Sequence, residues 1–400
     1  MNQLIPARSR RPDQDSIFSL NAEATRRRAA GERVVNATLG ALMHDDGTLA
    51  VLPSVTHTLA RVPAAEWAAY APFAGTGPFV EAVIADTFLG HPALREAAVG
   101  VSTPGGTGAL RHALTNYLEP GQALLTPSFH WGPYQTLADE HERRVETFNM
   151  FDGQGRLDVP ALEIRAAQQL AEQGRVLLFL NDPCNNPTGY SLSLPEWRAL
   201  ADALGRLAES GPVTLLVDMA YWLYGAAEDP RAFLGTLTPL LGKVGLLFAW
   251  SASKSFTHYG LRVGALLACA PDPADRAATE AAFVYSCRGT WSNCNRGGMW
   301  AITQLLTDEG LRRACDDERA GLKLLLRRRV ESFNAQAGRL SYPRYEGGFF
   351  VTVFHDQAEA KSVRMKEQGV FVVPQKGALR VALCSVNEAD LARLVAALED

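Results

Sequence analysis

The sequence predicts an α/β protein, built on a doubly wound, mostly parallel sheet with a smaller α+β domain beside it. Three observations lead to this fold class. Short apolar runs alternate with helical patterns between about residues 100 and 270, which is typical of βαβ units. Long helical stretches follow after about residue 300. The 400 residues are also enough for two or three domains of roughly 100–200 residues each.

Five apolar runs bounded by turn residues are the expected strands of the sheet. Because helices cover both faces of a parallel sheet, its buried strands are apolar throughout and do not alternate with polar residues. The runs are 123–126, 176–180, 213–217, 246–250 and 263–268.

Helical patterns fill the gaps between these runs. Apolar residues recur at helical spacing at Leu110, Ala113, Leu114, Tyr117 and Leu118. A second helix is expected to begin with a capping box, in which Ser193 and Glu196 each bond the backbone of the other.

The C-terminal third has a different pattern. It contains an arginine-rich helical stretch at 311–333, strand-like runs at 348–354 and 379–383, and a helix at 358–368 between them. The first 45 residues lack a sheet-like unit, so we expect them to pack on this part of the chain. The predicted division is a large domain at 48–308 and a small domain formed by 1–47 with 309–400.

Composition and charge exclude several classes of function. With 39 Lys+Arg against 43 Asp+Glu, the net charge of −4 predicts neither a nucleic-acid partner nor an anionic membrane partner. The arginine runs at 26–28 and 327–329 are interpreted as exposed helix faces. No apolar stretch approaches the ~20 residues of a spanning helix. Six scattered cysteines without a CxxC pair favour reduced thiols and a cytoplasmic location, and no spacing suits a metal site.

The sharpest local feature is Ser251-Ala-Ser253-Lys254, directly after the run 246–250. Open α/β sheets bind ligands at the carboxyl ends of their strands. Partial desolvation there favours the neutral, nucleophilic form of a lysine. Taken alone, the hexapeptide 251–256 fits a surface lysine at a strand end equally well.

Polar residues follow three other predicted strands or turns. A glycine-rich turn around Gly106 and Thr107 feeds a helix, whose N-terminus could bind a phosphate; it is neither a P-loop nor GxGxxG. Asn186, Asp218 and Tyr221 lie just past strand ends, where each alone would fit an ordinary turn. Together with a lysine they match pyridoxal phosphate, which requires a carboxylate at its ring nitrogen, polar contacts at its ring hydroxyl and a phosphate cradle.

In order and spacing these motifs resemble the fold-type I pyridoxal-phosphate aminotransferases, in their aspartate/aromatic (class I) branch, from about Asn36 to the C-terminus. Ser251-x-Ser-Lys254…Tyr259-Gly-Leu-Arg262-Val-Gly264 is similar to the lysine signature, and Pro104-Gly-Gly-Thr107-Gly-Ala-Leu-Arg111 to the phosphate turn. The resemblance implies a large cofactor-binding domain. It implies that Lys254 binds the cofactor covalently and that Ser251, Arg262, Gly106 and Thr107 hold the phosphate, with Ser253 among the cofactor-binding residues.

The same resemblance implies the remaining site residues. Asn186, Asp218 and Tyr221 would contact the cofactor ring, with Lys254, Asp218 and Tyr221 as the catalytic residues. Tyr70, in Trp67-Ala-Ala-Tyr70…Gly75, is similar to the tyrosine that reaches the partner's phosphate, which implies a homodimer with shared active sites.

Substrate residues are implied in the same way. Arg380 matches the arginine that grips the substrate α-carboxylate, for which a guanidinium is well suited. Arg288 matches an arginine that the neighbouring subunit sends to a distal carboxylate, and Gly40 a flexible glycine on the substrate side. Asn186 is also expected to contact substrate.

The chain departs from the family pattern in two places on the expected substrate side. Phe129 stands where the family usually has a tryptophan stacked on the cofactor ring, and Trp131 follows two residues later. Phenylalanine can still stack, so Phe129 is predicted to contact cofactor and substrate. Cys294-Asn295 replaces the usual pair of prolines. Dicarboxylic and aromatic donors therefore both stay open.

The predicted function is a pyridoxal-phosphate-dependent aminotransferase that moves an amino group between an amino acid and a 2-oxo acid. A lyase or decarboxylase on the same fold is the alternative, because the cofactor residues are shared. A non-catalytic, ligand-sensing relative is a further alternative, which the presence of Lys254 and the absence of an appended helix-turn-helix segment disfavour.

Overall fold

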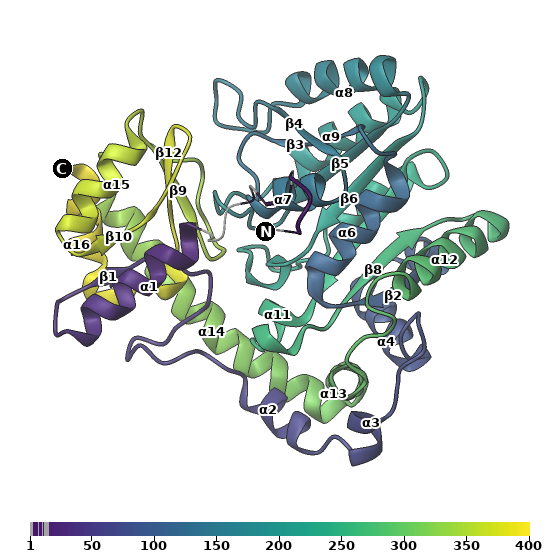
Figure 1. Cartoon of the computed structure of the whole chain (residues 1–400), viewed down its shortest axis with the longest axis horizontal. Coiled ribbons are helices and arrows are strands. Elements are labelled where there is room, and N and C mark those ends of the chain that lie inside the picture. The colour runs from purple at the N-terminus through teal and green to yellow at the C-terminus, as the bar shows by residue number, and fades with distance from the viewer. Residues whose placement is uncertain (1–2, 7, 10, 12–15) are drawn as a thin grey trace.

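A seven-stranded sheet with the strand order β2-β8-β7-β6-β5-β3-β4 positions the candidate site. The structure is a computed structural model that describes residues 3–6, 8, 9, 11 and 16–400 (Figure 1). The strands are β2 (Ala98–Thr103), β3 (Ala123–Pro127), β4 (Arg144–Phe148), β5 (Val176–Asn181), β6 (Val213–Asp218), β7 (Gly245–Ser251) and β8 (Gly264–Cys269). From β4 to β7 the neighbouring strands are parallel, whereas β8 runs antiparallel to β7 and β2.

The five predicted strands are confirmed, and two further strands were not predicted. The edge strand β4 has the polar sequence RVETF with half-exposed residues, and β2 contains Gly100, so neither reads as a continuous apolar run. The antiparallel course of β8 has a local cause. The connection from β7 holds only the one-turn helix α11 (Ala252–Ser255) and the 3₁₀ turn η3 (Tyr259–Leu261), too little for a crossover that covers one face of a sheet.

Helices cover both faces of this sheet, as predicted. Successive residues of β6 alternate between two apolar clusters, with Leu215 and Val217 in one and Leu216 in the other. Helices α6 (Gly105–Tyr117), α7 (Pro133–Glu140) and α12 (Pro273–Arg288) pack on the second face. The first face is covered by α4 (Gly77–Thr87), α8 (Val159–Gln173), α9 (Leu194–Leu207), α10 (Leu234–Leu237) and α13 (Arg296–Thr307). Smaller helices are α2 (Pro53–Ala60), α3 (Ala64–Ala68) and α5 (Pro92–Ala97).

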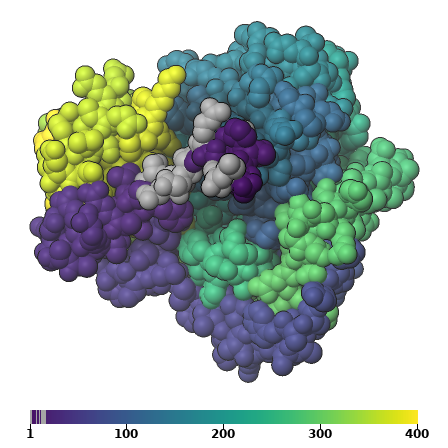
Figure 2. Space-filling view, viewed as in Figure 1, coloured from purple at the N-terminus to yellow at the C-terminus, as the bar shows by residue number. Residues whose placement is uncertain are grey.

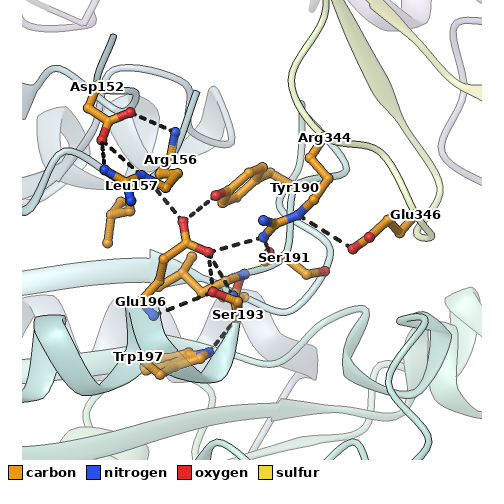
Figure 3. Close-up of polar contacts among 12 residues, drawn as sticks. Asp152, Arg156, Leu157, Tyr190, Ser191, Ser193, Glu196, Trp197, Arg344 and Glu346 are labelled. Atoms are coloured by element: carbon orange, nitrogen blue, oxygen red, sulfur yellow. Dashed lines mark hydrogen bonds and ion pairs between the residues drawn. The ribbon is translucent and has the colours of Figure 1, made fainter. Parts of the chain in front are cut away.

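Helix α9 begins with the predicted capping box between Ser193 and Glu196. The Glu196 carboxylate also accepts hydrogen bonds from Leu157 N at 3.0 Å and from Tyr190 Oη, and an ion pair from Arg344 at 3.1 Å (Figure 3). This single buried carboxylate therefore ties the start of α9 to a segment about 150 residues later in the chain.

Residues 16–36 lie beside the C-terminal part of the chain, as predicted for the first 45 residues, whereas Arg8 contacts α7 of the large sheet. Strand β1 (Val35–Asn36) pairs in parallel with β10 (Val370–Phe371), and α1 (Ser16–Ala29) packs beside them (Figure 1). Next to them β11 (Val373–Gln375), β12 (Ala378–Val381) and β9 (Val351–Phe354) form an antiparallel sheet with α15 (Ala358–Glu367) and α16 (Leu391–Glu399). The domain boundaries at 48 and 308 stay a prediction, and residues 1, 2, 7, 10 and 12–15 of the predicted small domain lie outside the described residues.

The long helix α14 (Glu309–Gln336) corrects one interpretation of the sequence. Arg329 was expected on an exposed face, but it is fully buried. Its guanidinium donates to Cys384 O and Met43 O and pairs with Asp45 at 2.7 Å. The three arginines at 327–329 point to different sides of the helix, so one of them must face the core.

The described residues of the N-terminal segment lie across one face of the molecule (Figure 2). Arg8 pairs with Glu140, the last residue of α7, at 3.2 Å. Among the described residues, no helix combines the length and apolar character needed to cross a membrane.

Candidate active site

The carboxyl ends of β5, β6 and β7 meet at one edge of the sheet. Asn181, the last residue of β5, stands opposite Asp218, the last residue of β6, and Ser251 ends β7. A cavity of about 180 Å³ opens at this edge. Its lining residues are Gly106, Thr107, Leu110, Trp131, Asn181, Asn186, Asp218, Ala220, Tyr221, Ser251, Ser253, Lys254 and Arg262. The residues predicted for the lysine, the ring and the phosphate turn are therefore brought together in one cavity.

The phosphate-turn residues form a close-packed cradle. Gly105 begins α6 with a φ of +72°, and a Cβ there would lie 2.4 Å from an Arg262 guanidinium nitrogen. A Cβ on Gly264 would lie 2.5 Å from the carbonyl carbon of Gly105. No side chain caps the N-terminus of α6, so its first N–H groups face the cavity side without a side-chain acceptor. This is the arrangement in which a helix N-terminus binds an anion.

Arg262 is fixed beside this cradle. It lies in the left-handed region with a φ of 53°, and its guanidinium donates to Ser253 Oγ at 3.2 Å and to Pro104 O at 3.2 Å. Ser251 Oγ accepts from Ser253 N at 3.3 Å. One guanidinium, two hydroxyls and a helix N-terminus thus converge on one end of the cavity, which is the donor set of a phosphate site.

Lys254 lies in α11 and lines the same cavity. Burial lowers the pKa of its ammonium, and the Asp218 carboxyl partly offsets this shift. Its Nζ lies 5.1 Å from the centre of the Tyr221 ring. Tyr221 Oη accepts from Asn186 Nδ2 at 3.4 Å, and burial raises the pKa of this phenol. A lysine with a lowered pKa is a stronger nucleophile and a better proton acceptor at neutral pH.

Asp218 is 4% exposed. Its Oδ2 accepts from Tyr134 Oη at 2.8 Å and its Oδ1 from Ala220 N at 3.1 Å. Burial raises the pKa of this carboxyl, while the Tyr134 hydroxyl and the nearby Lys254 charge lower it. A buried carboxylate of this kind gains most from a cationic N–H partner in the cavity.

These residues fit pyridoxal phosphate. The cradle at one end supplies hydrogen-bond donors and positive charge for its phosphate, and Asp218 supplies an acceptor for its protonated ring nitrogen. Asn186 and Tyr221 supply polar contacts between these ends, and Lys254 supplies the amine that the cofactor's aldehyde requires. The cofactor prediction is therefore compatible with every residue of the lining.

Phe129, which is predicted to contact cofactor and substrate, is not among the residues that line this cavity. Its ring packs on Phe151 at 6.1 Å and Phe354 at 5.6 Å, in an aromatic cluster that faces β9. Trp131, two residues later, lines the cavity instead. Both residues lie in the irregular segment between β3 and α7. Within this segment the cavity is lined by Trp131 and not by Phe129.

Asn186, one of the predicted substrate residues, lines the cavity, whereas Gly40, Arg288 and Arg380 lie outside its lining. Arg380 in β12 is 4% exposed, donates to Thr38 O and lies 4.8 Å from the centre of the Phe350 ring. A Cβ on Gly40 would lie 2.4 Å from Cζ of the same ring. Gly40 and Arg380 are thus joined through Phe350, whose ring also contacts Tyr221 at 5.7 Å. Phe350 belongs to the strand-like run 348–354 of the sequence and directly precedes β9, and its ring lies between the two predicted substrate residues.

Arg288 and Tyr70 also lie outside the cavity of their own chain. Arg288 ends α12, donates to Ser292 Oγ at 2.8 Å and lies 4.8 Å from the centre of the Phe73 ring. Tyr70 is 86% exposed. Both roles predicted for these residues need a second subunit, and they stay predictions.

Sequence reasoning missed several residues of the site. Asn181 donates to Asp218 O at 2.8 Å and accepts from Asn186 N at 2.7 Å, so it fixes the loop that carries Asn186. Its position directly after the predicted strand 176–180 was an available signal. Tyr134 offered no such signal, because only the packing of α7 on the sheet brings it to Asp218.

A sequence model of the family described as aminotransferase class I and II matches residues 32–398. The crystal structure of an aminotransferase from Anaerococcus prevotii superposes with a TM-score of 0.95 at 30% identity, over 100% of this chain and 98% of that one.

Two curated relatives differ in their named substrates. An aromatic-amino-acid aminotransferase of Pseudomonas aeruginosa is 32% identical over 237 residues, and this alignment covers 58% of the present chain and little over half (56%) of that protein. An aspartate aminotransferase of the same organism is 25% identical over 401 residues, which is 96% of both chains.

Proposed function

Since the chain belongs to the class I and II aminotransferases, with pyridoxal phosphate as cofactor and amino and 2-oxo acids as substrates, we propose that Lys254, Asp218 and Tyr221 carry its catalysis. The observation that carries this proposal is the single cavity shared by Lys254, the Asp218 carboxyl and the cradle at Gly106. When bound there, pyridoxal phosphate supplies an electron sink for the substrate carbon that loses its proton.

Lys254 is the proposed proton carrier. Because burial lowers the pKa of its ammonium, its amine can accept the substrate proton and return it on the other side of the transfer. Asp218 keeps a proton on the ring nitrogen opposite, since a buried carboxylate stabilises a cationic N–H. Tyr221 and Asn186, joined by a 3.4 Å contact, hold the ring oxygen.

The cofactor's phosphate is assigned to Gly106, Thr107, Ser251, Ser253 and Arg262, which line the same end of the cavity. We assign Tyr70 to the phosphate of a partner subunit in a homodimer. Its side chain is 86% exposed, outside its own cavity, and so is free to contact a second copy.

For the substrate we propose Arg380 and Gly40 at the α-carboxylate and Arg288 of the partner at the distal group. The position of Arg380 supports this assignment, because it is buried next to Phe350, whose ring contacts the cavity residue Tyr221. Dicarboxylic and aromatic amino acids are the proposed donors. A cytoplasmic location is proposed from the six free cysteines.

The test begins with the purified protein. It should be yellow, and borohydride should fix the cofactor onto the peptide that contains Lys254. A panel of amino donors with several 2-oxo acids should then show amino-group exchange. Label on another lysine contradicts the role of Lys254, and release of carbon dioxide or ammonia without exchange favours a lyase or decarboxylase. A protein that binds cofactor without turnover favours a ligand-sensing relative.

A further inference from the structure

Arg319, in the middle of α14, contacts the back of the turn that carries Lys254. Its side chain is only 8% exposed, and its Nε donates to Ser255 O at 2.7 Å. No part of Arg319 lines the cavity, so it lies behind the catalytic turn and not in the site itself.

The turn itself is short. Helix α11 has four residues. Ala252 O accepts from Phe256 N at 2.9 Å and Lys254 O from Thr257 N at 3.0 Å, and the chain then leaves through Thr257 at a φ of 52°. Two side chains from outside the turn add further donors. Tyr224 Oη donates to Lys254 O at 3.2 Å, and Arg319 donates to the next carbonyl, that of Ser255.

The Arg319 guanidinium is itself held rigidly. Its Nη1 pairs with Asp316 at 2.5 Å, its Nη2 contacts Cys315 Sγ at 3.1 Å, and the group lies 5.4 Å from the centre of the Phe256 ring. The N–H groups of a planar guanidinium point in fixed directions, so the other partners of Arg319 also fix the direction in which its Nε donates. The position of Ser255 O, and with it the backbone of Lys254, is therefore set by α14.

We propose that Arg319 is a positioning residue for Lys254, acting through the backbone of α11. A cation at the C-terminal end of a helix also complements the partial negative charge of its carbonyls. This inference deepens the proposed function, because it rests on Lys254 as the proton carrier. Proton transfer depends steeply on the placement of the amine, so a loosened turn lowers kcat and leaves substrate affinity nearly unchanged.

The main test compares Arg319→Met with Arg312→Met in the holoenzyme. Arg312 lies on the same helix and also pairs with Asp316, but its other partner is Asp86 and it does not touch the Lys254 turn. Hydrogen exchange of the peptide that contains residues 252–257 should be about tenfold faster in Arg319→Met and unchanged in Arg312→Met. For Arg319→Met kcat should fall about 10–100-fold with KM within about threefold.

Arg319→Lys keeps the charge but cannot satisfy Ser255, Asp316 and Cys315 in the same fixed geometry. For this variant we expect hydrogen exchange of residues 252–257 and a kcat between those of the wild type and of Arg319→Met. If Arg319→Met does not fold, Arg319→Lys is the variant to compare with Arg312→Met. Wild-type exchange and kcat in the Arg319 variants would overturn the proposal, and so would equal changes in the Arg312 control. Borohydride labelling of the wild type separates this inference from the proposed function. Absence of label at Lys254 contradicts the proposed function, whereas label at Lys254 together with wild-type exchange and kcat in the Arg319 variants overturns only this inference.

Discussion

Tyr134 Oη donates a 2.8 Å hydrogen bond to Asp218 Oδ2, and both side chains are buried. The second carboxyl oxygen accepts from Ala220 N. These two donors hold a carboxylate in a place where burial alone would raise its pKa and favour the neutral acid. The Tyr134 hydroxyl therefore helps to keep Asp218 ionised, which its proposed role at the ring nitrogen requires.

Tyr134→Phe removes this hydrogen bond and keeps the ring. A hydrogen bond to a buried charged group is worth roughly 1.5–3 kcal/mol, so kcat should fall about 10–100-fold. Because the pKa of Asp218 rises further without its donor, the acid limb of the kcat profile should move to higher pH. Tyr117→Phe is the control, since that tyrosine on α6 packs on Phe283. An unmoved acid limb in Tyr134→Phe contradicts this role.

Asp218→Ala should keep the cofactor bound, because the phosphate cradle and Lys254 are untouched. The half-reaction with an amino donor should slow by orders of magnitude, since an unprotonated ring is a poor electron sink. Single-turnover absorbance measurements check this, with the exposed Asp202→Ala as control. A near wild-type rate for Asp218→Ala means that the carboxyl does not act on the ring nitrogen.

Trp131 and Phe129 allow a paired test of which aromatic side chain contacts the cofactor. Trp131→Ala should weaken cofactor binding about tenfold or more, because an aromatic wall of the cavity is lost. Phe129→Ala should instead lower the melting temperature, through its contacts with Phe151 and Phe354, with little change in cofactor affinity. Cofactor titration and thermal unfolding separate the two effects. A larger affinity loss in the Phe129 variant restores the sequence prediction.

The contrast between these two residues shows what the sequence could predict. Lys254, Asp218, Asn186 and the glycine turn were predictable, because parallel strands bring their carboxyl ends to one edge of the sheet. Trp131 was not, since the path of an irregular segment such as 128–132 has no periodicity that assigns a side chain to one face.

Long-range packing explains the other omissions. Tyr134, Arg319 and Arg329 each act on a segment more than 50 residues away in the chain. An arginine on a helix is exposed far more often than buried, so composition alone assigns Arg329 to the surface. Its three oxygen acceptors come from a turn near residue 44 and from a loop after β12, which only the folded chain brings together.

Glu196 predicts a pH dependence of stability. Hydrogen bonds from Ser193 and Tyr190 outweigh burial and lower the pKa of this carboxyl from 4.5 to about 2. Since the folded-state pKa lies below the unfolded one, the stabilisation is complete above about pH 4.5 and is lost as the pH falls toward 2. After allowance for solvent screening we expect about 1–2 kcal/mol from this group at neutral pH.

Glu196→Gln should remove that dependence. Its free energy of unfolding should be lower than wild type at pH 7 and should converge on it as the pH falls through this window. Urea unfolding between pH 3 and pH 7, starting from protein that is folded at each pH, measures the difference. A constant difference across this range would contradict the assignment to ionised Glu196.

Replacement of Arg288 tests which substrate class the enzyme prefers. Arg288 is exposed at the end of α12, where its guanidinium is held over the Phe73 ring and bonded to Ser292. If it meets a distal carboxylate in the partner's site, the pair is charge-assisted and partly shielded from water. Arg288→Leu should then lower kcat/KM for aspartate and glutamate about thirtyfold or more, and leave aromatic donors nearly unchanged.

The control for this prediction is Arg276→Leu, on the first turns of the same helix, where the guanidinium donates to Ala270 O. It removes the same charge without reaching toward Phe73, so its donor selectivity should match the wild type. Equal losses for dicarboxylic and aromatic donors in Arg288→Leu indicate that Arg288 only packs at the subunit interface. If the wild type itself turns over no dicarboxylate, the distal group is not a carboxylate. Aromatic amino acids are then the expected donors. Their side chains would contact the Phe73 ring and the Arg288 guanidinium that lies over it.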